Sequence, residues 1–326
     1  MSHALALATG NPGVALPVEL TDVVRNAISN SVAANTQRAY QSDMRTYTTW
    51  CAEQGVTPLP SDAGTVATYL AWLVDTGRKI TTVRRHLASI SKAHQLAGGA
   101  NPAHHELVRR VMGGLQRQHG RTPDRATPLL AQDVRIVLAG IVGTDTAAVR
   151  DRALVLVGWH GALRRQELAN LTWRDVQQRP GGLVLELQGT KTDKSGDGQQ
   201  VGLARETDPQ VCPVAALQAW HKVCTGMDAG HDHAPVFPRL HKSGRPTTRA
   251  LTGQGVALVL TRRANAVGLE GVTGHSLRRG LVHEAHLRGV SDSRVMAATR
   301  HKSLTMLRIY QGEAGIVDQA PGRGLL

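Results

Sequence analysis

Cysteine is scarce in this chain, which argues against a fold held by disulfides or structural zinc. Only Cys51, Cys212 and Cys224 occur among 326 residues, and they are too few and too scattered for a disulfide framework or a zinc ribbon. A reducing compartment is the natural expectation. No segment approaches the roughly 20 consecutive apolar residues of a membrane span, and residues 1–14 lack the basic start and long apolar run of a signal peptide. We therefore expect a cytoplasmic protein with no membrane partner.

The usual sequence motifs for ATP and for metal ions are also missing. There is no Gly-x4-Gly-Lys-Ser/Thr loop to hold the phosphates of a nucleotide. His283 and His286 are three positions apart, whereas the zinc-protease motif needs two histidines four positions apart. The tripeptide His-Asp-His at 231–233 has metal-binding residue types but no fourth ligand nearby. We expect no metal and no cofactor.

Acidic residues are outnumbered by basic ones. The chain has 38 Lys and Arg against 25 Asp and Glu, a formal net charge of +13. Residues 1–128 carry 13 basic and 8 acidic residues and the remainder 25 and 17, so both parts are positive. General solubility is the alternative explanation, but an excess of this size favours a polyanionic partner, most often nucleic acid. A protein with two positive parts is consistent with one that encloses DNA from two sides.

The most informative residues lie near the C-terminus. His275 and Arg278 form a His-x-x-Arg pair, and a second histidine, His301, is followed nine residues later by Tyr310. Upstream, Arg164 lies in the segment Leu-Arg-Arg-Gln-Glu-Leu, which we expect to be helical. Two guanidiniums, two imidazoles and a phenol are what an enzyme needs to attack a phosphodiester without a metal.

The chemistry of phosphodiester cleavage explains these residue types. The planar guanidinium of arginine binds the charged non-bridging oxygens of a phosphate in a way that lysine cannot copy. A tyrosine hydroxyl, with a reference pKa of about 10, is a weak nucleophile and needs cationic neighbours or a base. His275 or His301 could accept its proton or bind the phosphate. The departing DNA hydroxyl needs a general acid, for which Lys191 is the candidate.

Taken together, these positions resemble those of the tyrosine recombinases, also called the phage integrase family. The resemblance covers roughly residues 36–311. Each motif by itself is weakly specific, but all six positions occur in the order that the family has. The resemblance implies catalytic roles for Arg164 in the first box, Lys191 in a β-turn, the pair His275 and Arg278, His301, and the nucleophile Tyr310.

Several of these residues also have an ordinary structural interpretation. Lys191 by itself would be a solvated loop lysine, and Tyr310 by itself a buried helix aromatic; only their order with the other motifs favours catalysis. Glu167 lies three positions after Arg164, so we expect it to orient an arginine or cap a loop rather than to react. Ala162, just before the first box, differs from many relatives, and we assign it no chemical consequence.

The sequence predicts a mainly α-helical chain with a small antiparallel β-sheet. The resemblance implies a two-domain, C-shaped DNA clamp made of a helical core-binding domain and a catalytic domain. A polar segment with Gly120, Pro123 and Pro128 is typical of a linker and is predicted to connect the two domains. The expected parts are a loose tail (1–17), the core-binding domain (18–118), a linker (119–128), the catalytic domain (129–312) and a C-terminal tail (313–326) that could dock on a neighbouring protomer.

Apolar residues at helical spacing predict a bundle of helices in the core-binding domain. Ser61 is the expected N-cap of one of these helices, and we expect the aromatic residues to pack in the core. Basic residues lie off the apolar faces; each by itself fits a solvated surface as well as a DNA contact, but the set favours DNA. The candidate contacts are Arg84, Arg85, Lys92, Arg109, Arg110 and Arg117.

The expected catalytic domain combines helices with two strands. The predicted strands are 183–187, which alternates, and 200–203. The predicted helices are 131–141, 147–161, a short one from 164, 212–224, 251–268, 275–288 and 292–298.

The resemblance implies a site-specific recombinase that joins Tyr310 to a DNA 3′ phosphate and uses neither metal nor ATP. Its partners would be double-stranded DNA with inverted-repeat sites, three further copies in a homotetramer that passes through a four-way (Holliday) junction, and an accessory directionality protein. It would act at the nucleoid. Two alternatives stay open: a type IB topoisomerase, which uses similar residues, and a catalytically silent DNA-binding regulator. Neither the target sequence nor the choice between integration, excision, resolution and transposition follows from the residues.

Overall fold

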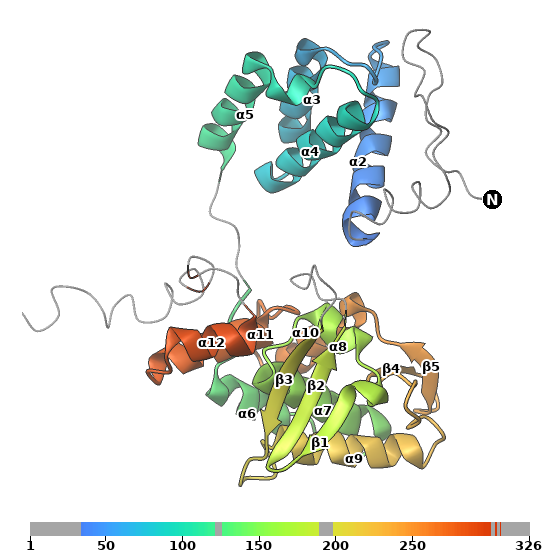
Figure 1. The fold of residues 1–326 in the computed structure, drawn as a ribbon, viewed down its shortest axis with the longest axis vertical. Coiled ribbons are helices and arrows are strands. Elements are labelled where there is room, and N and C mark those ends of the chain that lie inside the picture. Colours follow the sequence, from blue (N-terminus) through green and yellow to red (C-terminus); the bar gives the residue numbers. More distant parts are fainter. Residues whose placement is uncertain (1–33, 121–125, 189–197, 301–303, 305–306, 308–326) are drawn as a thin grey trace, which may run out of the picture. The chain divides into compact units, whose positions relative to one another are not determined.

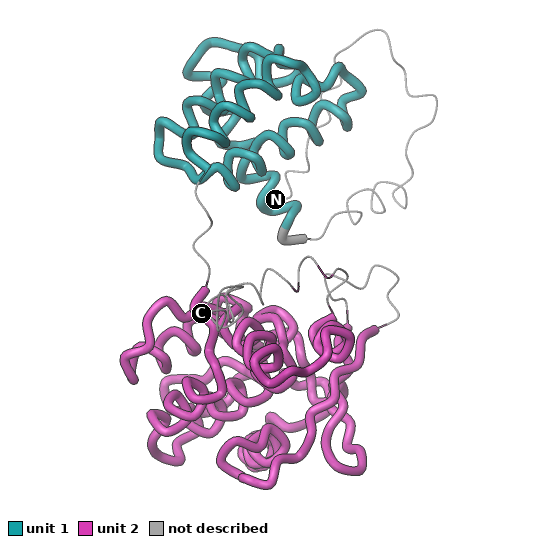
Figure 2. Tube along the Cα trace, turned by 90° about the vertical axis from the view of Figure 1, so that its left-hand side faces the viewer, with its two compact units in different colours: residues 1–123 teal, residues 124–326 magenta. Residues whose placement is uncertain are grey.

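The computed structural model describes residues 34–120, 126–188 and 198–300, together with 304 and 307. Contacts between Cα atoms divide the chain into two compact units, residues 1–123 and 124–326 (Figure 2). The boundaries expected for the tails, domains and linker stay predictions. Within the described ranges, no helix combines the length and the apolar character that a bilayer crossing requires.

The first unit consists of helices. The helix α3 begins after Asp62, whose carboxylate accepts a hydrogen bond from the Thr65 amide at 2.8 Å. The prediction of Ser61 as the N-cap was wrong by one residue, because the Ser61 amide is bonded to the His94 ring instead, at 3.0 Å. The elements are α2 (Ala34–Glu53), α3 (Ala63–Asp75), α4 (Ile80–Leu96), the 3-10 turn η1 (Pro102–His104) and α5 (Glu106–His119) (Figure 1).

Aromatic side chains fill the core of this first unit, as expected. Tyr47 and Tyr69 are fully buried, and their ring centroids lie 4.7 Å apart. Trp50 from α2 and Trp72 from α3 pack beside them. Tilted aromatic pairs at this distance contribute stability beyond the area they bury, so these rings join α2 to α3.

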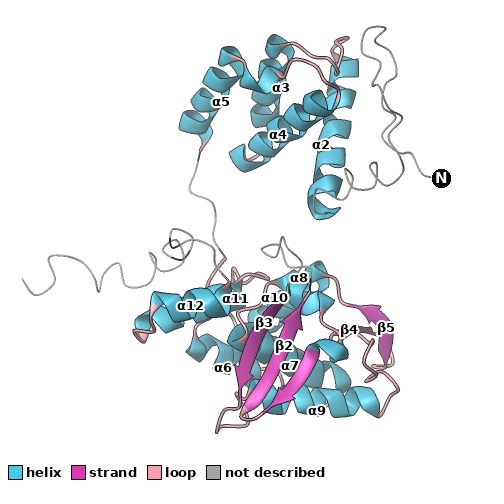
Figure 3. Ribbon diagram, in the orientation of Figure 1, coloured by secondary structure: helices cyan, strands magenta, loops and turns pink. Residues whose placement is uncertain are grey.

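The second unit contains the remaining helices and both sheets (Figure 3). The prediction of a mainly helical chain with a small antiparallel sheet is confirmed. The helices are α6 (Ala131–Ala139), α7 (Thr146–His160), α8 (Arg165–Asn170), α9 (Pro213–Thr225), α10 (Gly253–Asn265), α11 (Ser276–Leu287) and α12 (Asp292–Thr299), with the 3-10 turn η2 (Trp173–Asp175). The strands are β1 (Val176–Arg179), β2 (Gly182–Leu187), β3 (Gln199–Ala204), β4 (Pro238–Leu240) and β5 (Pro246–Ala250).

The three-stranded sheet has the order β1-β2-β3 and is antiparallel throughout. Leu183 pairs with Leu203, and Leu185 with Val201, so apolar residues on neighbouring strands share the buried face. Both predicted strands, 183–187 and 200–203, are therefore present. Strand β1 was missed because its sequence, Val-Gln-Gln-Arg, has little apolar alternation. The short strands β4 and β5, each of which begins at a proline, were also missed.

Helix α7 is buried over most of its surface and carries a charged residue into the core. Asp151 is fully buried. It accepts two hydrogen bonds from Arg150, the shorter at 2.7 Å, and one from Arg263 of α10 at 2.8 Å. A buried carboxylate needs such partners to offset its loss of hydration, so this cluster ties α10 to α7.

Helix α11, which carries Arg278, lies against the start of the second unit. The Leu129 amide donates to the Ser276 carbonyl at 3.1 Å, and the Trp159 indole donates to the Leu129 carbonyl at 2.9 Å. This close approach needs a glycine: a Cβ atom at Gly280 would lie only 1.7 Å from the Leu129 carbonyl oxygen.

We expect Gly280→Ala to destabilise the second unit, because the added methyl group would overlap a backbone atom that has its own hydrogen bond. Overpacking of this kind costs about 1–3 kcal/mol or more, measurable by calorimetric unfolding. Gly226→Ala is the matched control: its nearest neighbour would be 3.4 Å away, so it should be neutral or slightly stabilising. Equal unfolding temperatures for the two variants would contradict the assignment.

Candidate active site

Arg164 and Glu167 are brought together at the start of α8. Arg164 is the N-cap residue and has an extended backbone, so it lies immediately before the helix. The sequence had suggested a position within the helix. The Glu167 carboxylate accepts a hydrogen bond from the Arg164 backbone amide at 2.8 Å and another from the Arg164 guanidinium at 2.5 Å. One carboxylate thus caps the helix and holds the side chain of the preceding arginine.

Glu167 has a second arginine partner, which was not predicted from the sequence. Arg300 donates at 2.7 Å to Glu167 Oε2, the oxygen that also accepts the Arg164 backbone amide, and both side chains are 6 % exposed. Arg300 follows α12 with a left-handed backbone, φ +58°, which is uncommon for a residue other than glycine. The available signal was its position beside His301, together with the need of a buried carboxylate for several donors.

The backbone carbonyl of Ala162 joins this cluster to Arg278. Arg278 is 2 % exposed; it donates to the Ala162 carbonyl at 2.8 Å and also to the Thr299 carbonyl. Ala162 has a positive φ of 46°. Its carbonyl oxygen, which a residue of any type at this position would supply, orients the arginine of the His-x-x-Arg pair.

His275 occupies the N-cap position of α11, one turn before Arg278. His275 is exposed at the surface, and partial desolvation by the surrounding residues lowers the pKa of its imidazole. The guanidiniums of Arg165, Arg278, Arg164 and Arg279 lower it further, because each disfavours a second positive charge nearby. The neutral imidazole is the form that can accept a proton.

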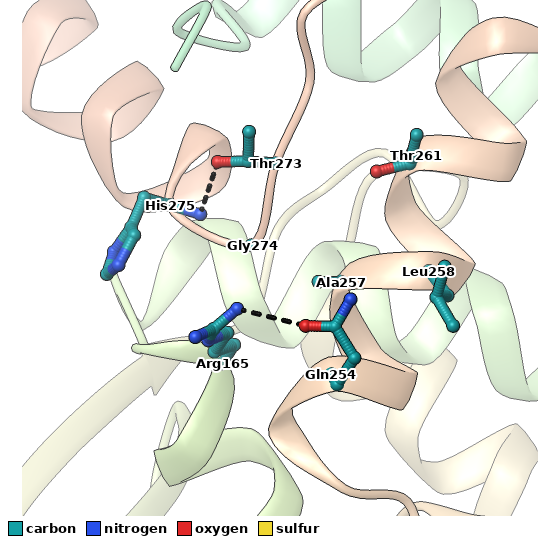
Figure 4. A pocket seen from close by; sticks show the side chains of 8 residues that line it. All are labelled: Arg165, Gln254, Ala257, Leu258, Thr261, Thr273, Gly274 and His275. Atoms are coloured by element: carbon teal, nitrogen blue, oxygen red, sulfur yellow. Dashed lines mark hydrogen bonds between the residues drawn. The ribbon is translucent and has the colours of Figure 1, made fainter. Parts of the chain in front are cut away.

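A pocket of about 340 Å³ opens beside His275. Figure 4 shows Arg165 and His275 on one side of it and Gln254 on the other. The Arg165 guanidinium donates to the Gln254 side-chain oxygen at 3.4 Å, and the Thr273 hydroxyl accepts the His275 backbone amide at 3.2 Å. Arg165 was not among the residues predicted from the sequence, because the first family motif contains the neighbouring Arg164 at its arginine position.

Three of the six predicted catalytic residues lie outside the described residues: Lys191, His301 and Tyr310. The other three, Arg164, His275 and Arg278, come close enough for the two guanidiniums to act on the histidine. Their roles stay predictions. In the part of the chain that the structure describes, no group of three or more His, Cys, Asp or Glu side chains is placed to hold a metal ion.

The basic candidates of the first unit fall into different environments. Arg85 forms two hydrogen bonds with the buried carboxylate of Asp43, at 2.8 and 2.9 Å, and Ser89 donates to the same carboxylate. Arg109 and Arg110 both pair with the exposed Glu106 of the preceding turn. For the remaining three no ion pair occurs within the described ranges; these are Arg84, Lys92 and Arg117.

Comparisons with known proteins give concordant matches. The model described as "Phage integrase family" matches residues 129–314, and "Phage integrase, N-terminal SAM-like domain" matches residues 27–98. An integrase/recombinase XerD homolog of Selenomonas ruminantium is 30 % identical over 90 % of this chain and 85 % of its own length. Recombinase Cre of Escherichia phage P1 is 24 % identical over 95 % of this chain and 94 % of its own.

Solved structures show the same fold. XerH recombinase bound to a palindromic difH substrate matches with a TM-score of 0.61 and 18 % identity, covering 81 % of this chain and 72 % of its own. A lambda integrase (75–356) dimer bound to a COC′ core site matches with a TM-score of 0.57 and 17 % identity, covering 88 % of this chain and 92 % of its own.

We expect Glu167→Gln to destabilise α8 and its surroundings. The substitution keeps the shape but removes the charge, which leaves the buried Arg300 guanidinium without its counterion; the cost is on the order of 3 kcal/mol. Hydrogen exchange of α8 peptides in increasing urea measures it. The matched control, Glu106→Gln, breaks an exposed pair and should cost less than about 1 kcal/mol. Similar losses in both variants would contradict a special role for Glu167.

We expect His275 to titrate below 6.5, its ordinary pKa. Between its folded pKa and 6.5 the unfolded chain binds the proton more readily, so acidification through this range lowers the free energy of unfolding. NMR titration of the imidazole, assigned by the signal lost in His275→Gln, measures the value. A pKa at or above 6.5 would show that burial and the neighbouring guanidiniums do not control this group.

Proposed function

The chain belongs to the phage integrase family and is a tyrosine site-specific recombinase, and we propose that it cleaves and rejoins DNA strands through a 3′-phosphotyrosyl intermediate formed on Tyr310. The reaction uses neither ATP nor a metal ion. The phosphotyrosyl bond retains the energy of the phosphodiester, so a DNA 5′ hydroxyl can attack it and restore the strand.

One observation carries this proposal: arginines from segments far apart in the sequence converge beside His275. Arg278 and Ala162 are 116 positions apart, and Arg300 and Glu167 are 133 positions apart, yet each pair is hydrogen-bonded. Fixed guanidiniums need little reorganisation when charge develops on a phosphate, and one preorganised donor is worth a few kcal/mol in the transition state. This supports charge stabilisation by Arg164 and Arg278. His301 would be a further donor, as the family resemblance implies.

The proposed cleavage step begins with attack by Tyr310. The Tyr310 oxygen forms a bond to the scissile phosphorus, and the bond from phosphorus to the 5′ oxygen breaks. His275 takes the tyrosine proton, which its neutral form can accept. Lys191 gives a proton to the departing 5′ oxygen. Glu167 does not react; it holds Arg164 and Arg300 in place.

We propose double-stranded DNA with inverted-repeat sites as the partner. The palindromic substrate of XerH and the core site bound by the lambda integrase dimer support this choice. A homotetramer on two sites would exchange strands through a four-way junction, an accessory protein would set direction, and the protein would act at the nucleoid. Residues 18–118 and 129–312 would serve as core-binding and catalytic domains.

Within the core-binding domain, the basic residues proposed to contact DNA differ in whether a carboxylate already pairs with them. Arg84, Lys92 and Arg117 have charges that no described carboxylate neutralises, so they are the better candidates. Arg85 is occupied by Asp43. Arg109, Arg110 and Glu106 form exposed pairs, which are weak and can exchange for phosphate contacts.

We expect wild-type protein, incubated with fragmented genomic DNA in chelator and then denatured, to retain covalently bound DNA enriched in one inverted-repeat sequence. Tyr310→Phe should abolish this adduct and keep binding in a gel shift, because it removes only the nucleophilic oxygen. Tyr40→Phe is the matched control, since it removes a hydroxyl from the first unit, and it should leave the adduct unchanged.

Other outcomes would change the assignment. Adducts without sequence preference would indicate topoisomerase-like relaxation. Intact binding without any adduct in the wild type would indicate a catalytically silent regulator. Adducts that persist in Tyr310→Phe would remove Tyr310 from the nucleophile position.

A further inference from the structure

The pocket beside His275 is built from three separate segments. Arg165 begins α8, Gln254 and Leu258 come from α10, and Gly274 and His275 come from the turn before α11. Figure 4 shows the Arg165 and Gln254 side chains meeting within it. The pocket is open to solvent, so a long molecule lying on the surface can place a small charged group there without being enclosed.

The Arg165 guanidinium carries a charge that its described surroundings do not neutralise. Arg164 and Arg300 are both paired with Glu167, at 2.5 and 2.7 Å. Arg165 instead contacts a neutral amide, Gln254, at the long distance of 3.4 Å, and no described carboxylate lies within ion-pair distance of it. Several guanidiniums close together repel one another, so this arrangement favours an anionic ligand.

The stem of Arg165 is held in place by the turn that carries His275. Gly274 is buried, and a Cβ atom there would lie 2.8 Å from the Arg165 Cδ and 3.0 Å from its Cβ. The glycine thus lets the aliphatic part of the arginine pack directly against the backbone. A side chain fixed in this way loses less conformational freedom when its guanidinium binds a ligand.

We propose that Arg165, oriented by Gln254, binds a second phosphate of the DNA backbone, next to the one that is cleaved. This inference rests on the proposed function and extends it to a residue outside the six catalytic positions. A planar guanidinium with unoccupied donors suits a phosphodiester. Arg165 touches the DNA but does not exchange protons with the reacting atoms, so its role is binding and positioning.

The salt dependence of DNA binding tests this proposal. Each phosphate contact contributes about −0.9 to the slope of log K against log salt concentration. The slope is measured by fluorescence anisotropy with a short labelled duplex of mixed sequence. Arg165→Gln should make the slope less steep by about one, whereas Arg165→Lys, which keeps the charge, should retain it.

Arg179→Gln is the matched control, because it removes one exposed arginine charge from β1. Among the described residues, the Arg179 guanidinium is hydrogen-bonded only to the Gln177 side chain. Its slope should equal that of the wild type. Equal slopes for Arg165→Gln and Arg179→Gln, whether both reduced or both unchanged, would overturn the proposal.

The covalent adduct assay separates this inference from the proposed function. If wild-type protein forms the adduct but Arg165→Gln leaves the slope unchanged, the recombinase assignment stands and the phosphate site is wrong. If the slope falls as expected but no adduct forms in the wild type, Arg165 binds DNA and the cleavage reaction is wrong.

Discussion

The arrangement of the active site depends on one buried carboxylate. Glu167 accepts hydrogen bonds from the backbone and side chain of Arg164 and from the side chain of Arg300. It therefore fixes the start of α8 and the end of α12 relative to each other. Without a carboxylate at this point, the buried guanidinium would have no counterion, and several positive charges would be left to repel one another.

Buried carboxylates are paired with arginine at two other places in the chain. Asp43 in the first unit is satisfied by Arg85, and Asp151 in the second by Arg150 and Arg263. Arginine suits these sites because its guanidinium stays charged and donates several hydrogen bonds in a fixed geometry. The 38 lysines and arginines consequently overstate what DNA can use, since some of the arginines neutralise buried carboxylates. The net charge of +13 already allows for these pairs.

A group of fixed cations also determines what the neighbouring histidine can do. An isolated histidine is partly protonated near neutral pH, but desolvation and the guanidiniums around His275 favour its uncharged form. In the proposed mechanism, the arginines that bind the phosphate would therefore act together with desolvation to keep the histidine available as a base.

The order of the motifs identified the family by resemblance. Helical spacing predicted most of the helices, because residues three or four apart on a helix are neighbours whatever surrounds them. Polar or very short strands such as β1 gave no such pattern. The sequence also could not reveal that Ala162 supplies a carbonyl to Arg278 or that Arg300 shares Glu167 with Arg164. Those partners lie more than 100 positions apart, and only the packing of α8, α11 and α12 decides which buried donor meets which acceptor.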